Sequence, residues 1–353
     1  MKTITVTASK TYDVLVGTGL LSQVGALTAK VVSPCKAAIL TDDTVDALYG
    51  ATTEISLEEA GFEVVKFVFP HGESSKNLTV FGQALNFLAE HHLSRSDLIV
   101  ALGGGVVGDL AGFVAAVYLR GIRFIQIPTT LLAAVDSSVG GKTAVDLDTG
   151  KNLAGAFWQP ELVVCDCALL STLPERTFRE GCAEVLKYGV LLGEDFFRTL
   201  ETADLRKDIE EIVAVCVACK RDIVEGDEFD RGQRQLLNLG HTIGHAVEAR
   251  SGYDLFHGEC VAIGMAAVAR AAAKLGHTTQ ETCDRILRLI RQYGLPTETG
   301  FTADELYAVC CSDKKIAAGT IRLVVPEAIG SCTLHPMAVP ELRSWIEKGI
   351  APC

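Results

Sequence analysis

The sequence lacks any apolar run long enough to cross a membrane. Charged residues or glycines interrupt every stretch of about 18 residues, so we expect no membrane-spanning segment and no membrane partner. The N-terminal residues MKTITVTASKTYDV alternate apolar and polar side chains and contain no apolar core of a signal peptide. We therefore expect the chain to begin with a β-strand and the protein to be cytoplasmic.

An excess of basic residues is also missing, because 44 Asp and Glu residues outnumber 32 Lys and Arg residues and the formal net charge is −12. A protein that binds bulk nucleic acid normally has the opposite balance, so we exclude nucleic acid as a partner. The 12 cysteines are scattered. Cys216 and Cys219 have redox-motif spacing but lie in an apolar helical stretch, which indicates buried, reduced thiols.

The composition that is present is globular: 353 residues, 48% hydrophobic and 22% charged, enough for two domains. In the N-terminal part, short apolar runs alternate with amphipathic stretches such as Asn77–His91, a pattern typical of a parallel sheet covered by helices. The expected strands are Ala37–Thr41, Phe62–Phe69, Leu98–Leu102 and Phe124–Ile127. From about Leu173 the chain reads mainly as helices. We predict a Rossmann-like α/β domain over residues 1–160 and a mainly α-helical domain over residues 161–353.

A glycine-rich segment follows the expected strand Leu98–Leu102. Gly103, Gly105 and Gly108 form a G-x-G-x-x-G pattern, which lets backbone amides at a helix N-terminus approach a phosphate. The alternative is a tight turn without a ligand, because the motif follows a late strand and no acid lies about 20 residues further on. Asp42, also after a strand, is either a ligand contact or a helix N-cap. Glu73 and Lys76 belong to a loop that is either a nucleotide contact or solvated.

Residues 128–152 are rich in small polar residues, glycine and lysine. Lys142, Lys151 and Asn152 follow glycines, so we expect cations on flexible backbone that bind an anionic group, together with Arg120. The alternative is an ordinary exposed loop. Asp136 lies among apolar and small residues, and a partly buried carboxylate there needs a partner.

Histidines and a carboxylate in the C-terminal half suggest a divalent-metal site. His241 and His245 are four residues apart and share one face of a helix, and His257 follows after a Ser-Gly break. Glu184 lies on an otherwise apolar helix, where it either pairs with Lys187 or supplies an oxygen ligand. Three protein ligands with an open position are the catalytic arrangement of zinc. The alternative is a set of ordinary core imidazoles.

Two further residues precede the histidines. Arg234 and Asn238 fall roughly on one helical stripe with His241 and His245, which could face the same cleft. A metal beside a nicotinamide cofactor suits alcohol oxidation, because the metal polarises the oxygen and the cofactor accepts the hydride. The additional lysines and arginines indicate a substrate that carries its own phosphate or carboxylate.

Several motifs then occur in a specific order. They are GGGVVGDLAGF, YLRG, IPTTLLAAVDSSVGGKTAVD, GKNLAGAF, AEVLKYG, LLNLGHTIGHAVE, FHGECVAIGM and DKK. From about Asp42 to Lys315, the chain resembles the 3-dehydroquinate synthase family of the sugar-phosphate cyclase superfamily. The resemblance implies an N-terminal NAD-binding domain, a helical metal-binding domain and an active site between them.

The resemblance also implies roles for individual residues. The implied ligands of Zn²⁺, or of Co²⁺ in its place, are Glu184, His241 and His257. The implied NAD contacts are Asp42, Glu73, Lys76, Gly104, Gly105, Asp109, Thr129, Thr130, Lys142, Lys151 and Thr172. The implied substrate or catalytic residues are Asp136, Lys142, Asn152, Lys187, Lys220, Arg234, Asn238 and His245, with Arg120 reaching across a homodimer. Lys314 or Lys315 is implied to close over the site.

The implied reaction converts 3-deoxy-D-arabino-heptulosonate 7-phosphate to 3-dehydroquinate and phosphate, in the shikimate route to aromatic amino acids. Oxidation at C5 acidifies the C6 proton, phosphate leaves by β-elimination, the hydride returns, and an aldol step closes the ring. The alternatives are another cyclase of the superfamily, such as a 2-deoxy-scyllo-inosose or valiolone-type synthase, a metal-dependent polyol dehydrogenase, and a non-catalytic protein that retains the fold.

Overall fold

The computed structural model describes residues 1–252, 254–311 and 319–351. The chain forms two compact units. Unit 1 comprises Met1–Leu173 and Ile209–Phe229, and unit 2 comprises Pro174–Asp208 and Asp230–Cys353. This division differs from the boundary at residues 160/161 expected from the sequence. Unit 1 extends to Leu173. It also includes helix α8 (Ile209–Gly226), which lies in the part of the sequence that was expected to form the helical domain.

Side-chain contacts explain why α8 belongs to unit 1. Glu225 on α8 accepts a hydrogen bond from the backbone N–H of Thr7 at 2.6 Å, and Glu211 pairs with Lys2. The apolar side of the helix, including Val213 and Val217, is buried. A helical pattern in the sequence identifies the helix but not the sheet on which it packs.

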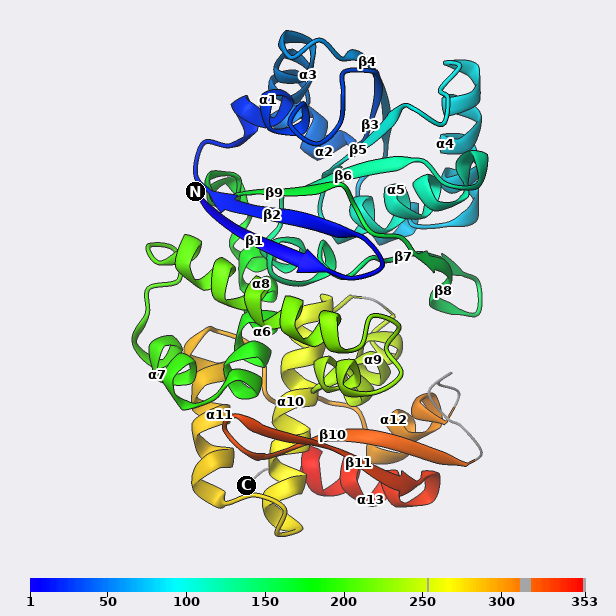
Figure 1. Cartoon of the computed structure of the whole chain (residues 1–353). Coiled ribbons are helices and arrows are strands. Elements are labelled where there is room, and N and C mark those ends of the chain that lie inside the picture. Colours follow the sequence, from blue (N-terminus) through cyan, green and yellow to red (C-terminus); the bar gives the residue numbers. More distant parts are fainter. Residues whose placement is uncertain (253, 312–318, 352–353) are drawn as a thin grey trace. The chain divides into compact units, whose positions relative to one another are not determined.

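Unit 1 is built on a seven-stranded sheet with the order β1-β2-β9-β6-β5-β3-β4 (Figure 1). The strands are β1 (Lys2–Thr7), β2 (Thr11–Gly17), β3 (Lys36–Asp42), β4 (Glu63–Phe69), β5 (Leu98–Gly103), β6 (Arg123–Pro128) and β9 (Leu162–Asp166). Only the β1–β2 pair is antiparallel among these neighbours. The four strands expected from apolar runs are present, and the alternating N-terminus forms a hairpin of two strands.

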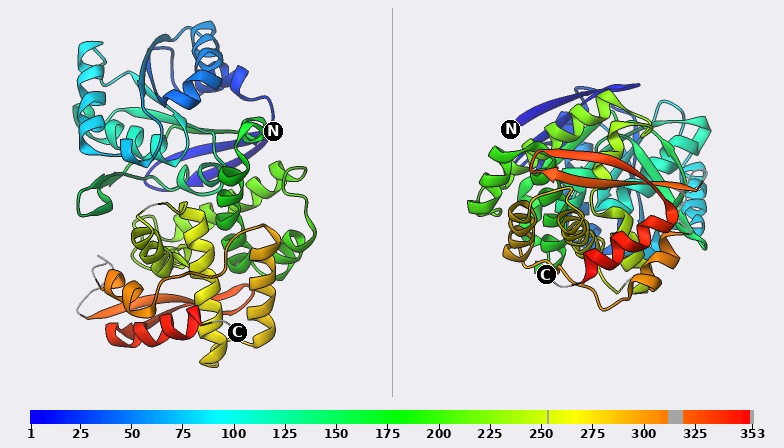
Figure 2. Two further views of the ribbon diagram at one scale, coloured as in Figure 1. Left: turned by 180° about the vertical axis from the view of Figure 1, so that it is seen from behind. Right: turned by 90° about the horizontal axis from the view of Figure 1, so that it is seen from below.

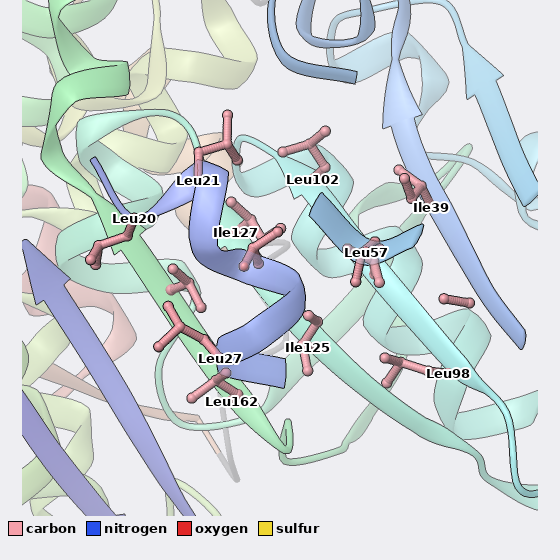
Figure 3. Packing of buried hydrophobic residues seen from close by; sticks show 14 of the residues in the cluster. Leu20, Leu21, Leu27, Ile39, Leu57, Leu98, Leu102, Ile125, Ile127 and Leu162 are labelled. Carbon is pink, nitrogen blue, oxygen red and sulfur yellow. The ribbon is translucent and has the colours of Figure 1, made fainter. Parts of the chain in front are cut away.

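Helices cover both faces of this sheet. The helical elements of unit 1 are η1 (Leu21–Gln23), α1 (Val24–Thr28), α2 (Asp43–Val45), η2 (Asp46–Gly50), α3 (Ala51–Glu59), η3 (Glu73–Ser75), α4 (Leu78–Glu90), α5 (Gly105–Val117), η4 (Tyr118–Arg120), η5 (Ala133–Ser137), η6 (Cys167–Thr172) and α8. Side chains alternate along each strand. Leu98 and Leu102 therefore pack with α1 and α3 (Figure 3), whereas Ile99 packs with α4 and α5 on the other face.

Residues 128–152 differ from the flexible segment expected there. Lys142–Leu147 forms β7, and Gly150–Phe157 forms β8, an antiparallel hairpin. The two strands approach closely at Gly155, where a Cβ atom would lie 2.1 Å from the carbonyl oxygen of Thr143. Lys142, Lys151 and Asn152 are thus carried by paired strands rather than by a loop.

Unit 2 is mainly helical. Its elements are α6 (Glu175–Leu192), α7 (Glu194–Thr202), η7 (Gln233–Asn238), α9 (His241–Arg250), α10 (His257–Lys274), α11 (Gln280–Gln292), α12 (Ala303–Cys310), β10 (Thr320–Ala328), β11 (Ser331–Ala338) and α13 (Val339–Ile350). The buried helix α10 forms the centre of the core, and the β10–β11 hairpin and α13 pack beside it (Figure 2). The β10–β11 hairpin is an addition to the helices that were expected in this part of the chain.

The cysteines expected to be buried thiols are buried in the structure. Cys165 and Cys182 are buried thiols; burial raises the pKa of Cys165 and raises that of Cys182 to about 12, so both remain protonated. Cys216 and Cys219 are likewise buried on α8. Among the helices in the described part of the chain, none is both long and apolar enough to span a bilayer.

Candidate functional site

Three helices of unit 2 bring the proposed metal ligands together. Glu184 lies in the middle of α6, and His241 and His257 are the first residues of α9 and α10. Glu184 Oε1 is 3.3 Å from Nε2 of both His241 and His257. The three donor atoms lie within 4.8 Å of one another. One carboxylate oxygen and two imidazole nitrogens converging on one point form a donor set that suits Zn²⁺ or Co²⁺.

Close helix packing explains this convergence. At Gly258, a Cβ atom would lie 2.0 Å from the carbonyl oxygen of Glu180 on α6, and at Gly264 it would lie 1.9 Å from the carbonyl oxygen of Gly240. Only glycine permits such approaches. The glycines therefore let α10 contact both α6 and the start of α9, and the two histidines come to lie beside Glu184.

The second oxygen of Glu184 is engaged by Lys187. Glu184 Oε2 and Lys187 Nζ form an ion pair in which both side chains are buried. Burial alone would raise the pKa of Glu184, but Lys187, His241 and His257 outweigh it and lower the pKa well below its ordinary value. Glu184 therefore pairs with Lys187 through one oxygen and faces the histidines with the other, so the ion pair does not exclude a ligand role for this carboxylate.

Each imidazole is oriented through its second nitrogen. His241 Nδ1 is 3.1 Å from the carbonyl oxygen of Leu239, and His257 Nδ1 is 3.7 Å from Glu248 Oε2. A proton on Nδ1 in each ring leaves the Nε2 lone pair available to a metal. Burial lowers the pKa of His241. Burial would also lower the pKa of His257, but Glu184 and Glu248 raise it to about 10.

His245 lies next to this triad without belonging to it. Its ring centroid is 5.5 Å from that of His241 and 5.8 Å from that of His257. His245, Glu248 and His257 form a second group whose donor atoms lie within 4.8 Å of one another. His245 is therefore adjacent to the triad, and the substrate or catalytic role that the resemblance implies for it stays a prediction.

The helical stripe expected before the histidines is wrong in one respect. Arg234 and Asn238 lie on the separate 3-10 helix η7, and α9 begins only after Gly240, which has a left-handed φ of 80°. The Arg234 side chain is buried, with 1% of it exposed. Asn238 Nδ2 donates to the carbonyl oxygen of Gln235 at 3.1 Å. A turn therefore separates these two residues from the helix of His241 and His245.

In unit 1 the glycine-rich segment joins β5 to α5. Gly104 is the N-cap of α5, and no side chain caps the helix, so its first amides are available to an anion. A Cβ atom at Gly104 would lie 2.9 Å from Thr130 Cγ2. The hydroxyl of Thr129, at the end of β6, is buried and has no hydrogen-bond partner among the described residues. The segment therefore offers amides, close backbone access and a buried hydroxyl.

Charged residues surround this segment. Lys76 Nζ is 2.6 Å from Asp109 Oδ2 and 4.0 Å from Glu73 Oε1, and Lys151 Nζ is 3.3 Å from Glu73 Oε1. Burial would lower the pKa of Lys76, but the charges of Asp109 and Glu73 raise it. Lys76 is therefore a buried member of an ion-pair network, whereas Glu73 and the residues next to it are in part exposed.

Two other proposed NAD contacts lie at the ends of structural elements. Asp42, at the end of β3, accepts a hydrogen bond from the backbone N–H of Val45 at 2.8 Å and is the N-cap of α2. The hydroxyl of Thr172 donates to the carbonyl oxygen of Leu169 at 2.9 Å and also contacts the hydroxyl of Tyr49. The N-cap alternative for Asp42 therefore applies, and one carboxylate can both cap a helix and face a ligand.

Asp136 has the partner that its partly buried position requires. Lys220 Nζ on α8 pairs with the Asp136 carboxylate and donates to the Asp136 carbonyl oxygen at 2.6 Å.

The hairpin β7–β8 carries two further predicted site residues, Asn152 and Lys142. Asn152 has a left-handed φ of 55°, and its N–H donates to Asp146 Oδ1 at 2.7 Å. Lys142 is exposed on β7.

Arg120 belongs to a strained segment. Leu119 and Arg120 have φ values of 51° and 69°, which non-glycine residues rarely adopt, and both side chains are exposed. Such strain often occurs at functional segments.

The units thus divide the proposed site residues into two groups. Unit 1 carries Asp42, Glu73, Lys76, Gly104, Gly105, Asp109, Arg120, Thr129, Thr130, Asp136, Lys142, Lys151, Asn152, Thr172 and Lys220. Unit 2 carries Glu184, Lys187, Arg234, Asn238, His241, His245 and His257. Lys314 and Lys315 lie outside the described residues.

Three carboxylates near these groups were not identified from the sequence. Glu248 faces His257, and Asp146 holds the backbone of Asn152. Glu180 lies one helical turn before Glu184; burial raises its pKa to about 7 although His257 opposes this. Glu248 follows His241 by seven residues on the same helix, and that spacing was the available signal. Side-chain direction was still needed to distinguish it from an ordinary helical glutamate.

Similarities to known proteins agree with this geometry. Residues 66–180 match the family model described as "3-dehydroquinate synthase N-terminal", and residues 181–316 match that described as "3-dehydroquinate synthase C-terminal". A protein of Streptococcus suis named 3-dehydroquinate synthase is 45% identical over 343 residues, which cover 95% of this chain and 97% of the relative.

Solved structures of two other cyclases share the fold. A 2-deoxy-scyllo-inosose synthase, complexed with carbaglucose-6-phosphate, NAD⁺ and Co²⁺, has a TM-score of 0.88 at 24% identity, with 99% and 100% of the two chains covered. The 2-epi-5-epi-valiolone synthase of Streptomyces hygroscopicus, with NAD⁺ and Zn²⁺ bound, has a TM-score of 0.86 at 26% identity and coverage of 97% and 98%. On the matches to both domain models and the identity over nearly the whole length, the chain belongs to the 3-dehydroquinate synthase family.

Proposed function

We propose that the protein converts 3-deoxy-D-arabino-heptulosonate 7-phosphate to 3-dehydroquinate and phosphate, with NAD and a divalent metal as cofactors. The observation that carries this proposal is the convergence of Glu184 Oε1 with the Nε2 atoms of His241 and His257, each at 3.3 Å. Relatives with this activity in their names are 42–45% identical to the chain over nearly its full length.

Zn²⁺ or Co²⁺ fits the triad because its donors are one carboxylate oxygen and two imidazole nitrogens. Three protein ligands of these types are the set that catalytic zinc sites use, and a metal held by them would supply Lewis-acid polarisation of a substrate oxygen. Lys187 keeps Glu184 ionised, and the carbonyl oxygen of Leu239 holds the proton of His241 on Nδ1. Lys187 and the Leu239 carbonyl therefore keep the Glu184 and His241 donor atoms in the protonation state that a metal requires.

NAD fits the segment between β5 and α5 because amides, a glycine and a buried hydroxyl with no hydrogen-bond partner in the described part of the chain meet there. The amides after Gly104 would hold the pyrophosphate, and the hydroxyl of Thr129 would find its missing partner in the dinucleotide. A valiolone synthase of 26% identity has NAD⁺ and Zn²⁺ bound. When bound, the metal would polarise the oxygen of the hydroxyl that is oxidised, and NAD would accept the hydride from the carbon that carries it.

The remaining cations suit a substrate with two anionic groups. We assign Lys142, Asn152, Lys187 and His245 to the phosphate, and Lys220, Arg234 and Asn238 to the carboxylate and ring hydroxyls. Asp136 orients Lys220 through their ion pair. Fixed cations hold a leaving phosphate near the carbon that loses its proton, which favours β-elimination without a separate strong base.

The same proposal includes the assembly and location of the protein. Exposed Arg120 would contact the substrate of the partner in a homodimer, and the reduced, buried cysteines suit the cytoplasm. Among the alternatives, cyclases with uncarboxylated substrates correspond to solved structures of 24–26% identity, against 42–45% for relatives named 3-dehydroquinate synthase. The iron-containing and polyol-type dehydrogenases share the fold at still lower identity, for example 16% for a probable glycerol dehydrogenase.

Phosphate release and NADH absorbance test this function together. We expect purified protein with zinc and substoichiometric NAD to release phosphate from the heptulosonate in many turnovers, without net NADH. Chelator should abolish the release. Net accumulation of NADH would identify a dehydrogenase instead, and faster phosphate release from an uncarboxylated sugar phosphate would identify another cyclase.

A further inference from the structure

A carboxylate outside the metal triad faces the ring of one ligand. Glu248 lies on α9, two turns after His241, and only 5% of its side chain is exposed. Its Oε2 is 3.7 Å from His257 Nδ1, whereas Nε2 of the same ring is 3.3 Å from Glu184 Oε1. His257 is therefore placed between two carboxylates, one on each ring nitrogen.

A neutral imidazole has one protonated nitrogen and one lone pair, and only the lone pair binds a metal. A carboxylate beside Nδ1 holds the proton there, fixes the ring plane and makes Nε2 more basic. We propose that Glu248 is a positioning residue that orients His257 and strengthens its bond to the metal. This inference rests on the proposed assignment of Glu184, His241 and His257 as ligands.

The two histidines are held in different ways. The Nδ1 of His241 is 3.1 Å from the backbone carbonyl of Leu239, so a side-chain substitution does not remove its partner. The Nδ1 of His257 faces a side chain, and that partner carries a negative charge. A single substitution at Glu248 therefore changes the environment of one ligand and leaves the other unchanged.

The second donor group, His245, Glu248 and His257, offers a competing interpretation. There, Glu248 and His257 Nδ1 would themselves bind a second ion. His257 Nδ1 cannot hold a proton toward Glu248 and bind a metal at the same time. The positioning role therefore predicts one tightly bound ion per chain, and the ligand role predicts two.

Zinc competition with a chromophoric chelator tests the proposal. Starting from holoenzyme, we expect Glu248→Gln and Glu248→Ala to weaken zinc binding by about 10- to 100-fold, the usual range for a lost outer-shell partner, with the larger loss for Ala. The d–d absorption of the Co²⁺-substituted protein should shift in both variants. Glu259→Gln is the matched control, because Glu259 caps the same end of α10 through the Phe256 N–H at 2.9 Å and pairs with Arg176. It should bind zinc like the parent.

The outcomes are separable. Parent-like zinc affinity and Co²⁺ spectrum in Glu248→Gln and Glu248→Ala would overturn the positioning role. Two ions per parent chain, with one lost in Glu248→Gln and in His245→Ala, would overturn it in favour of a ligand role. If the parent holds no zinc, the metal assignment in the proposed function fails instead. Thermal unfolding of the metal-free variants shows whether a loss of affinity reflects loss of folding.

Discussion

Each unit buries a lysine against a carboxylate at its candidate ligand site, but the two carboxylates are shifted in opposite directions. In unit 1, burial raises the pKa of Asp109 although Lys76 lies 2.6 Å away. In unit 2, burial would likewise raise the pKa of Glu184, but Lys187 and His241 outweigh it and lower the pKa well below its ordinary value.

The difference arises from the number of cationic groups around each carboxylate. Asp109 is in contact with one lysine, Lys76; the charge of Lys220 adds less to the lowering of its pKa, and the charge of Glu73 opposes both. Glu184 has Lys187 on one oxygen and two imidazoles on the other. A buried ion pair by itself is therefore no sign of a metal site. A carboxylate that remains ionised because several cationic or metal-binding groups surround it is a much stronger sign.

The largest expected effect distinguishes the Glu184–Lys187 pair from the Asp109–Lys76 pair, because only the first is proposed to bind a metal. Glu184→Gln should lose zinc and lower turnover by more than about 100-fold, since removal of a ligand exceeds the loss of an outer-shell partner. It should also destabilise unit 2 by about 3–5 kcal/mol, because Lys187 is left buried without its carboxylate. Asp109→Asn should destabilise the protein less and keep its zinc. Metal analysis measures the zinc content of each variant, and denaturant unfolding measures its free energy of unfolding. A full zinc content in Glu184→Gln would contradict the ligand assignment.

An intermediate effect concerns pH. Glu184 and Glu248 raise the pKa of metal-free His257 to about 10, so zinc must displace one proton from it. Zinc affinity should then rise about tenfold per pH unit, or about 100-fold from pH 7 to 9. Chelator competition across this range, with proton release measured by calorimetry in two buffers, gives the slope. Affinity independent of pH would show that His257 is already neutral.

The same shift predicts the opposite trend for the metal-free protein. Because the folded-state pKa of His257 is raised from 6.5 to about 10, its contribution to the free energy of unfolding is complete below about pH 6.5. That contribution is lost as the pH rises toward 10. Zinc binding and metal-free stability should therefore change in opposite directions over the same interval.

The smallest expected effect is in unit 1, where the site is formed largely by backbone. In Gly104→Ala, the added Cβ would lie 2.9 Å from Thr130 Cγ2, at the N-cap whose following amides we propose for the pyrophosphate. We expect the Kd for NAD to rise about tenfold, equivalent to about 1.4 kcal/mol, in calorimetric titrations. Gly82→Ala is the matched control, since a Cβ on that α4 residue meets nothing within 4 Å. Equal Kd values for the two variants would exclude backbone contact at Gly104.

Patterns that depend on neighbouring residues were readable from the sequence. The apolar runs of β3, β4, β5 and β6 and the amphipathic α4 were expected within one residue or so of their observed limits, because burial on a sheet or helix has a local period. The hairpin β7–β8 was not expected. Its glycines and polar residues look like a loop, and only the pairing of the two strands makes them regular.

Sequence alone determined the α/β and helical parts and the chemical types at the site: a carboxylate, imidazoles, lysines and a glycine-rich turn. Tertiary structure decided which oxygen of Glu184 faces the histidines, that η7 is separate from α9, and that Glu248 reaches His257. It also decided that α8 belongs to unit 1 and not to the helical unit. The physical reason is that side-chain identity and periodicity are local properties, whereas ionisation and orientation depend on neighbours that only close packing of distant helices supplies.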